Sequence, residues 1–285
     1  MKVTVSDNIG CKFKKNEWFN DEILRIISQV YKDIKQVELV EGDKVLASIP
    51  TTINAIGEYA FMGWSLPFAK WEWFSDDLDS LILLEKLGAK EGVQIDIVNL
   101  LCPDVGLKKD AGLKMITVRD RETFISSFTG RFKKNIRRAL RASEKATYEP
   151  VSVQETMPLL EYWFELYDND SLKAVKELYL YWERIGKLKA YGIYLQGEMV
   201  GADYLLYGED WVNGLLTPWY KNRQEVADLQ IGYLAIVEAV DRLHKEGEKL
   251  FSLGDGMFGY KDKWADVTVP TYTLGLGRWE WREDD

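Results

Sequence analysis

The sequence predicts an α+β fold with mixed, mainly antiparallel sheets, and three observations point to it. Apolar residues recur at helical spacing in several segments of both halves. Short strand patterns flank tight turns, as expected for hairpins. In the second half, three successive strand patterns are followed by a helix and one more strand. The chain of 285 residues is long enough for two domains or for one large domain.

Composition narrows the class of protein. Hydrophobic residues make up 46% and charged residues 29% of the chain, which is typical of a soluble globular protein. The formal net charge of −9 argues against general affinity for nucleic acids. No apolar run has membrane-spanning length and the first ten residues do not resemble a signal peptide, so we expect a cytoplasmic protein without a membrane span.

The small number of cysteine and histidine residues predicts that the protein holds no metal. Cys11 and Cys102 lack the spacing of a metal site or of a disulfide framework. The single histidine, His244, excludes a histidine cluster and disfavours a Ser-His-Asp triad. It lies near a predicted helix end, where a solvent-facing or capping role is expected.

In the first half we expect two helices, a hairpin and a further strand. The helices should begin after Asn20 and after Ser75, whose side chains can accept hydrogen bonds from the N–H groups of a first turn. The predicted strands are Val37–Val40, Val45–Ile49 and Val93–Leu101. Residues 51–74 are aromatic and irregular, and within them Trp64 and Trp73 are candidates for one wall of a substrate groove. The alternative is that this loop only covers a core.

A basic helix is predicted at the middle of the chain, within residues 123–145. Its cationic residues are Arg131, Lys133, Lys134, Arg137, Arg138, Arg141 and Lys145, and its apolar side contains Phe124, Phe128, Phe132, Ile136 and Leu140. Such a run of charge is commonly a solvated helix face. It can also hold the phosphates of a nucleotide, a coenzyme or a tRNA end, with Arg131 and Arg137 as substrate-binding candidates.

The remaining elements follow in a clear order. The predicted strands are Tyr148–Val153, Leu188–Leu195, Met199–Tyr207, Trp211–Trp219, Leu250–Leu253 and Val267–Leu276. The predicted helices are Thr156–Tyr167, Leu172–Ile185 and one that Asp228 caps and Gly247 ends. The N–H groups at the start of this last helix, around Gln230 and Gly232, can face an anion. A glycine-rich turn follows Leu253 and leads into Tyr260 and Lys261.

Several of these features together resemble a known superfamily. The second half is similar to the core of the GNAT acyltransferases. It has three antiparallel strand patterns, then a helix that opens with Ile231-Gly232-Tyr233-Leu234, and then a further strand. Two further stretches resemble the FemAB-like and CelD-type (cellulose-biosynthesis acetyltransferase-like) branch. One is the basic stretch 128–138, and the other is the ending Leu253-Gly254-Asp255-Gly256 followed by Gly259-Tyr260-Lys261-Asp262-Lys263-Trp264. Gln230-Ile231-Gly232 matches part of the phosphate-loop pattern of the superfamily, Arg/Gln-x-x-Gly-x-Gly/Ala.

The resemblance implies both an architecture and an activity. It implies two GNAT-like domains, which we place at residues 1–122 and 123–285, the second opening with the basic helix. It implies transfer of an acyl group, expected to be acetyl, from acyl-CoA to an amine or hydroxyl of a small-molecule, sugar or peptide acceptor. In this superfamily the third strand and the start of the following helix hold the acyl-CoA. The corresponding residues here are Leu216, Thr217, Gln230, Ile231, Gly232 and Tyr233.

Acyl transfer needs a base, a clamp for an oxyanion and a proton for the leaving thiolate. Asp203 lies within a strand, where burial raises the pKa of a carboxyl group and makes it a better base; the alternative is a structural bond to a neighbouring strand or arginine. Asp255 is a second catalytic candidate, with a turn-forming role as the alternative. Tyr260 can protonate the thiolate. Lys261 can offset developing negative charge or bind a carboxyl or phosphate group of the donor. The alternative is that it pairs with Asp255 or Asp262 and stabilises the turn. Backbone N–H groups of Leu216 and Thr217 can form the clamp if their strand bulges.

Two other functions are compatible with the same fold. A FemAB-like, aminoacyl-tRNA-dependent peptidyltransferase is favoured by the basic helix and disfavoured by the acidic net charge and the lack of a coiled-coil pattern. A non-catalytic protein that binds a glycan or a peptide is favoured by the partial phosphate loop. The sequence leaves open the acceptor, the acyl length, the oligomeric state and whether the donor is CoA, a carrier protein or tRNA.

Overall fold

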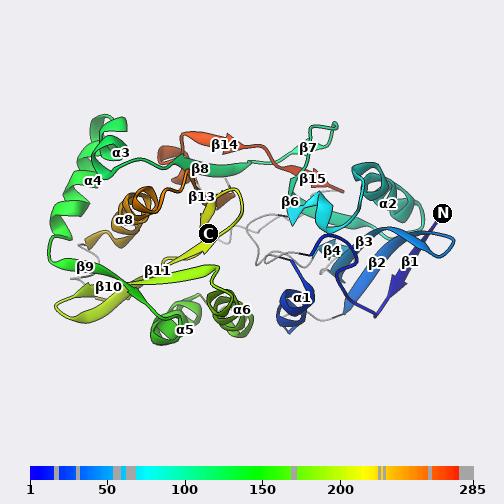
Figure 1. Cartoon of the computed structure of the whole chain (residues 1–285), viewed down its shortest axis with the longest axis horizontal. Helices are drawn as coiled ribbons and strands as arrows, with labels where there is room; N and C mark the ends of the chain where they lie inside the picture. Colours follow the sequence, from blue (N-terminus) through cyan, green and yellow to red (C-terminus); the bar gives the residue numbers. More distant parts are fainter. Residues whose placement is uncertain are drawn as a thin grey trace. The chain divides into compact units, whose positions relative to one another are not determined.

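The computed structural model of the chain divides into two compact units. The structure describes residues 1–15, 19–29, 33–53, 59–61, 69–167, 172–223, 226, 229–255 and 259–275. One unit spans Lys114–Thr268, and the other contains Met1–Leu113 together with residues from Val269 onward. Figure 1 shows the elements of each unit. The predicted division into domains after residue 122 stays a prediction.

The first unit is built on one mixed sheet with the strand order β1-β2-β3-β4-β6-β15-β7, and β5 pairs with β6 beside this path. Its strands are β1 (Lys2–Ser6), β2 (Ile34–Glu41), β3 (Lys44–Ile53), β4 (Tyr59–Phe61), β5 (Ala69–Lys70), β6 (Ile95–Leu101), β7 (Lys108–Lys109) and β15 (Tyr272–Leu274). Its helices are α1 (Asp21–Ile27), α2 (Leu78–Lys90) and the 3-10 turn η2 (Trp71–Trp73).

The starts of the two α-helices test the predicted caps. Asn20 caps α1 as predicted, because its side chain accepts hydrogen bonds from two first-turn N–H groups at 3.0 and 3.1 Å. The prediction for Ser75 was wrong. The hydroxyl of Ser75 donates instead to the carbonyl of Leu46, and Asp77 caps α2 by accepting from the N–H of Ser80 at 2.7 Å.

The aromatic segment 51–74 is more regular than predicted, since its described part contains the end of β3 and all of β4, β5 and η2. These short strands are held by partners distant in sequence, which a local pattern does not reveal. Trp73 does not line a groove: it is 1% exposed and stacks on Phe19 with 5.1 Å between ring centroids. The core role left open for this loop therefore applies to Trp73, while Trp64 lies outside the described residues.

The second unit contains a sheet with the order β14-β8-β13-β12-β11-β10-β9. Its strands are β8 (Leu113–Thr117), β9 (Ala146–Val151), β10 (Leu188–Leu195), β11 (Glu198–Tyr207), β12 (Val212–Gly214), β13 (Leu250–Asp255) and β14 (Val267–Val269). Its helices are α3 (Arg121–Ser127), α4 (Gly130–Ala142), α5 (Met157–Leu166), α6 (Leu172–Arg184) and α8 (Ile231–Glu246), with the 3-10 turns η3 (Gln154–Thr156) and η4 (Lys261–Lys263). β9 to β12 pair antiparallel, and β12 and β13 pair parallel. The predicted α+β fold with mixed, mainly antiparallel sheets is thereby confirmed.

Helix α8 and the pair α5 and α6 cover opposite faces of this sheet (Figure 1). Successive residues of β11 show why, because side chains alternate between the faces of a strand. The hydroxyl of Tyr204 donates to Oγ1 of Thr156, directly before α5, at 2.6 Å. The next side chain, Leu205, belongs to the core cluster around α8.

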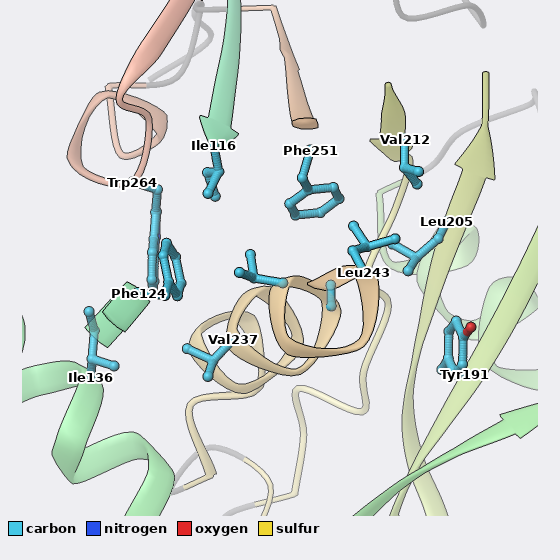
Figure 2. Packing of buried hydrophobic residues seen from close by; sticks show 12 residues of the cluster. Ile116, Phe124, Ile136, Tyr191, Leu205, Val212, Val237, Leu243, Phe251 and Trp264 are labelled. Atoms are coloured by element: carbon cyan, nitrogen blue, oxygen red, sulfur yellow. The ribbon is translucent and has the colours of Figure 1, made fainter. Parts of the chain in front are cut away.

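Figure 2 shows the core around α8, where the buried stripe of the helix meets β13 and β8. Val237 and Leu243 of α8 pack with Phe251 of β13 and Ile116 of β8, all at most 3% exposed. The apolar side of the predicted basic helix packs here as well, through Phe124, Phe128, Phe132, Ile136 and Leu140. The prediction of one basic helix was wrong, since the chain bends between α3 and α4, where Gly130 has a positive φ of 57°.

Three other boundaries differ from the predictions. The strand expected over residues 211–219 ends at Gly214. The expected last strand is two strands, β14 in one sheet and β15 in the other, separated by Pro270, which has no N–H to donate. Helix α8 begins at Ile231, with Gln230 as its N-cap in a left-handed conformation, and Asp228 lies outside the described residues. None of the described helices is long and apolar enough to cross a membrane.

Candidate active site

A β-bulge follows β12. Leu205 pairs with Gly214, and Gly201 bridges to Trp219, so three residues of β11 (202–204) lie opposite four residues (215–218). The extra residue interrupts the ladder, and Pro218 cannot donate to it. Within the described part of the chain, the N–H groups of Leu216 and Thr217 have no hydrogen-bond acceptor. The strand therefore bulges as the predicted clamp requires.

A cavity of about 530 Å³ opens beside this bulge, and we call it the α8 cavity. Its walls come from the bulge after β12, from β13, from the first turns of α8 and from η4. Seven of the predicted site residues line it: Asp203, Leu216, Thr217, Gly232, Tyr233, Tyr260 and Lys261. The parallel pairing of β12 and β13 covers only Val212 with Phe251 and Asn213 with Ser252, so the two strands part where the cavity begins.

Asp203 contributes a buried carboxyl group to the wall of this cavity. Asp203 is 3% exposed, and both oxygens of its carboxyl group accept hydrogen bonds. The hydroxyl of Tyr148 donates to Oδ2 at 2.8 Å, and the hydroxyl of Thr217 donates to Oδ1 at 2.9 Å. Burial raises the pKa of Asp203 above its usual value, while the two hydroxyl donors act in the opposite direction. The carboxyl group is thus bonded both to β9, which lies beyond β10 in the sheet, and to the bulge after β12.

A second layer of aromatic residues holds Tyr148 in place. Its ring stacks on Tyr191 with 5.0 Å between centroids and an interplanar angle of 8°. The guanidinium of Arg242 lies 4.5 Å from the centre of the Tyr191 ring. Burial, together with the nearby Asp203, raises the pKa of Tyr148 well above its usual value, so its hydroxyl group keeps its proton and remains a donor to Asp203.

Two backbone donors in the first turn of α8 have no hydrogen-bond acceptor among the described residues. The N–H groups of Tyr233 and Leu234 bond to the carbonyl of Gln230, whereas those of Ile231 and Gly232 find no acceptor among the described residues. No acidic side chain stands in this first turn. A Cβ added at Gly232 would meet no atom within 4 Å, so the space beside this turn is open. Together these features suit an anion.

The turn after β13 places a phenol and an ammonium group in the same cavity. Tyr260 is 54% exposed and Lys261 is 7% exposed, and both line the α8 cavity from adjacent positions at the start of η4. A Cβ at Gly254, which has a φ of 82°, would lie 3.5 Å from Nζ of Lys261. Glycine thus lets the end of β13 pass close to this ammonium group. Asp262 forms its ion pair with Lys114, at 2.8 Å.

The remaining predicted residues do not line this cavity. Ile231 is a buried residue of the core under α8, and Gln230 is the N-cap of α8. Asp255 ends β13, and its side chain lies outside the described residues. Arg131 and Arg137 are exposed on α4. Arg137 borders a separate surface cavity of about 410 Å³ together with Lys134, Leu140 and Arg141.

Sequence reasoning missed the aromatic part of the α8 cavity. Phe132, Trp163, Trp219 and Trp264 line it, and Tyr148 supports Asp203 from β9. Two of these residues had a usable signal. Trp219 stands two residues after Thr217 and therefore on the same side of an extended segment, and Trp264 closes the Tyr260–Trp264 ending. Among the described residues no three histidine, cysteine or acidic side chains gather as a metal site would need.

A comparison with known families supports one general class of reaction for this site. Residues 130–262, which carry the bulge, α8 and the turn up to Asp262, match the family model described as the acetyltransferase (GNAT) domain. This part of the chain is therefore similar to GNAT acetyltransferases, which supports acyl transfer as the general class of reaction. No curated protein gives a significant match to the chain.

Solved structures share the fold over nearly the whole chain. FemX is 10% identical, with a TM-score of 0.54 and coverage of 93% of this chain and 93% of that chain. L-PGS from Bacillus licheniformis is 13% identical, with a TM-score of 0.54 and coverage of 94% and 93%. A conserved protein of unknown function from Bacteroides thetaiotaomicron is 12% identical, with a TM-score of 0.55 and coverage of 92% and 98%. At these identities the likeness shows the fold alone.

Proposed function

We propose that the protein transfers an acyl group, acetyl in the first instance, from acyl-CoA to an amine or hydroxyl group of a small-molecule, sugar or peptide acceptor. The observation that carries the proposal is the α8 cavity, which brings a bulged strand, a helix start and three polar side chains together. The match of residues 130–262 to the acetyltransferase (GNAT) model supports the same reaction. Within that superfamily, the Tyr260–Trp264 ending favours the FemAB-like and CelD-type branch.

The donor is proposed to enter beside α8. Its pyrophosphate would accept hydrogen bonds from the N–H groups of Ile231 and Gly232, at the positive end of the helix dipole. Its pantetheine arm would run along the bulge after β12, where the ladder is interrupted. The thioester carbonyl would then face the N–H groups of Leu216 and Thr217, which act as the clamp for the oxyanion.

The chemistry then needs one proton to leave the acceptor nitrogen and one proton to reach the thiolate. The neutral acceptor nitrogen attacks the thioester carbonyl, a C–N bond forms, and the oxyanion is held by the N–H groups of the bulge. The proton lost by the nitrogen passes to the oxygen of Thr217 as the hydroxyl proton of Thr217 moves to Asp203, along the 2.9 Å hydrogen bond. The C–S bond breaks, and Tyr260 gives its proton to the thiolate. Lys261 offsets the negative charge that develops during these steps.

A ligand-stabilisation experiment tests the proposal. Melting temperatures are measured with acetyl-CoA, with longer acyl-CoAs and with total tRNA, because a ligand that binds only the folded state raises the melting temperature. We expect acyl-CoA to stabilise the protein. Release of free thiol from the stabilising donor, measured against a panel of amines and alcohols, then identifies the acceptor class. If no acyl-CoA raises the melting temperature at concentrations up to the millimolar range, the proposed donor is wrong.

A second candidate function is FemAB-like transfer from an aminoacyl-tRNA. The observation that favours it is the cationic face of α4, on which Arg131, Lys134, Arg137, Arg138 and Arg141 are all exposed. Phosphate contacts make such binding strongly salt-dependent. Stabilisation by tRNA that is lost in Arg137→Glu and at high salt, together with no effect of acyl-CoA, would favour this candidate over the first.

A further inference from the structure

An aromatic cage surrounds the ammonium group of Lys221. Nζ lies 4.8 Å from the ring centres of Trp163 and Tyr167 and 5.5 Å from that of Trp219, and it donates a hydrogen bond to the hydroxyl of Tyr167. We call these three rings the Trp163 cage. Cations within about 6 Å of a ring centre are attracted to the ring face, most strongly for tryptophan.

The three rings form a concave surface. Trp163 stands in the middle, 5.2 Å from Tyr167 and 4.8 Å from Trp219 between ring centroids. Its plane is inclined by 55° to the first ring and by 52° to the second. Rings inclined in this way direct their faces toward a common point rather than stacking flat. Among the described residues no carboxylate pairs with Lys221, so the rings and one phenol hold the cation.

The Trp163 cage is continuous with the α8 cavity, because Trp163 and Trp219 line both. Trp163 comes from α5, which covers the face of the sheet opposite α8 (Figure 1). The α8 side is where the donor is proposed to enter. The cavity therefore has an aromatic wall that derives from the other face of the sheet, and the side chain of an exposed lysine occupies the cage beside it.

We propose that the Trp163 cage is the binding site for an alkylammonium group of the acceptor, and that Lys221 occupies it when no acceptor is bound. This inference rests on the proposed acyl transfer and names its acceptor class. A reacting amine must be neutral, whereas the cage favours a cation. The cation in the cage is therefore a second, non-reacting group, and the acceptor is a diamine or another compound that carries a separate ammonium group.

Because Lys221 and the ligand compete for the same rings, removal of the lysine ammonium should raise the affinity for a ligand cation. The probe is choline, and its neutral counterpart is 3,3-dimethyl-1-butanol, which has nearly the same shape. Calorimetric titration should show choline binding to Lys221→Met about tenfold more tightly than to the natural protein, the scale of one desolvated cation–π contact. The neutral alcohol should bind both proteins equally and weakly.

Lys189→Met is the matched control. Nζ of Lys189 also lies over a ring, 4.3 Å from the centre of Tyr207, but neither residue lines the α8 cavity. Choline affinity should not change in this variant. Tyr167→Leu, added to Lys221→Met, should abolish the gain; Tyr167 is 52% exposed, so its loss leaves the core intact. Equal choline binding by the two lysine variants, or equal binding of choline and the alcohol by Lys221→Met, would overturn the proposal.

The titration contains no acyl donor, so its failure can be told apart from failure of the proposed function. Choline binding without any thiol release from acyl-CoA would leave the cage in place and overturn acyl transfer. Thiol release without cage-dependent choline binding would support acyl transfer and overturn the proposed role of the cage. Where both succeed, KM for a diamine acceptor should fall in Lys221→Met relative to a monoamine of equal length, with kcat nearly unchanged.

Discussion

The hydroxyl of Thr217 donates a hydrogen bond to Oδ1 of Asp203 across 2.9 Å. This bond joins the bulge after β12 to the middle of β11, at the point where the two segments lose their regular register. The carboxyl group that accepts the bond is buried, and the residue that donates it also belongs to the proposed oxyanion clamp. A single bond therefore connects the proposed base with the proposed clamp.

Asp203→Asn should lower kcat by about two to four orders of magnitude, the usual scale of a lost general base. The amide retains the shape but cannot take up the proton. Since burial raises the pKa of Asp203 above 3.8, the base form is present only above that raised pKa. In the natural protein kcat/KM should therefore fall as the pH drops through the pKa of Asp203. Profiles of rate against pH should show this fall in the natural protein and not in the variant. Full activity in a folded Asp203→Asn protein would contradict the proton-acceptor role.

Gly232→Glu should abolish stabilisation by acyl-CoA. The new side chain enters open space beside the first turn of α8, so folding should be unaffected, while bulk and negative charge occupy the position of the proposed pyrophosphate. Gly232→Gln is the matched control, because it adds nearly the same bulk without charge and should keep part of the effect. The readout is the shift in melting temperature on adding acetyl-CoA. An unchanged shift in the glutamate variant would place the donor elsewhere.

Lys261→Met should lower turnover by about two orders of magnitude or more, the scale of losing one electrostatic donor to the transition state. Donor binding should weaken less. Tyr260→Phe should cost less than the lysine change, because water can replace a half-exposed phenol as the proton source. Steady-state kinetics beside melting curves distinguish this role from a structural one, in which activity and melting temperature fall together and activity recovers at low temperature.

Tyr179→Phe should flatten the loss of stability at alkaline pH. Burial raises the pKa of Tyr179 well above 10 in the folded protein, so above about pH 10 only the unfolded chain loses this proton. The stability that Tyr179 contributes is complete below the unfolded pKa and is lost as the pH rises, by up to about 1.4 kcal/mol per pH unit. Urea unfolding at pH 8 and pH 11 measures the difference. Equal declines in both proteins would mean that the Tyr179 hydroxyl titrates alike in the two states.

The parts of the site that follow local rules were predictable from the sequence. An aspartate inside a strand pattern, a glycine in the first turn of a helix and the Tyr260-Lys261 pair after a glycine-rich turn each give a signal within a few residues. These four lie around one cavity because three strands, a helix and a strand in this order bring a bulge, a helix start and a turn together.

The aromatic wall as a whole was not predictable, because its members are distant in sequence and no local pattern shows that they meet. Trp163 lies on a helix that reads as an ordinary amphipathic element, and it meets Trp219 only after the sheet has formed. Trp73 shows the opposite error, since an aromatic residue in an irregular segment was assigned to a groove and lies in a core. The short strands β7 and β8 were missed for the same physical reason, because their pairing partners lie far along the chain.

The separation of β14 from β15 has a consequence for synthesis on the ribosome. Within its sheet β15 lies between β6 and β7, so the sheet of the first unit lacks an internal strand until residue 274 has been translated. All residues of the second unit precede β15 in the chain. The sheet of the first unit therefore gains this internal strand only after every residue of the second unit has been translated, and until then β6 has one unpaired edge.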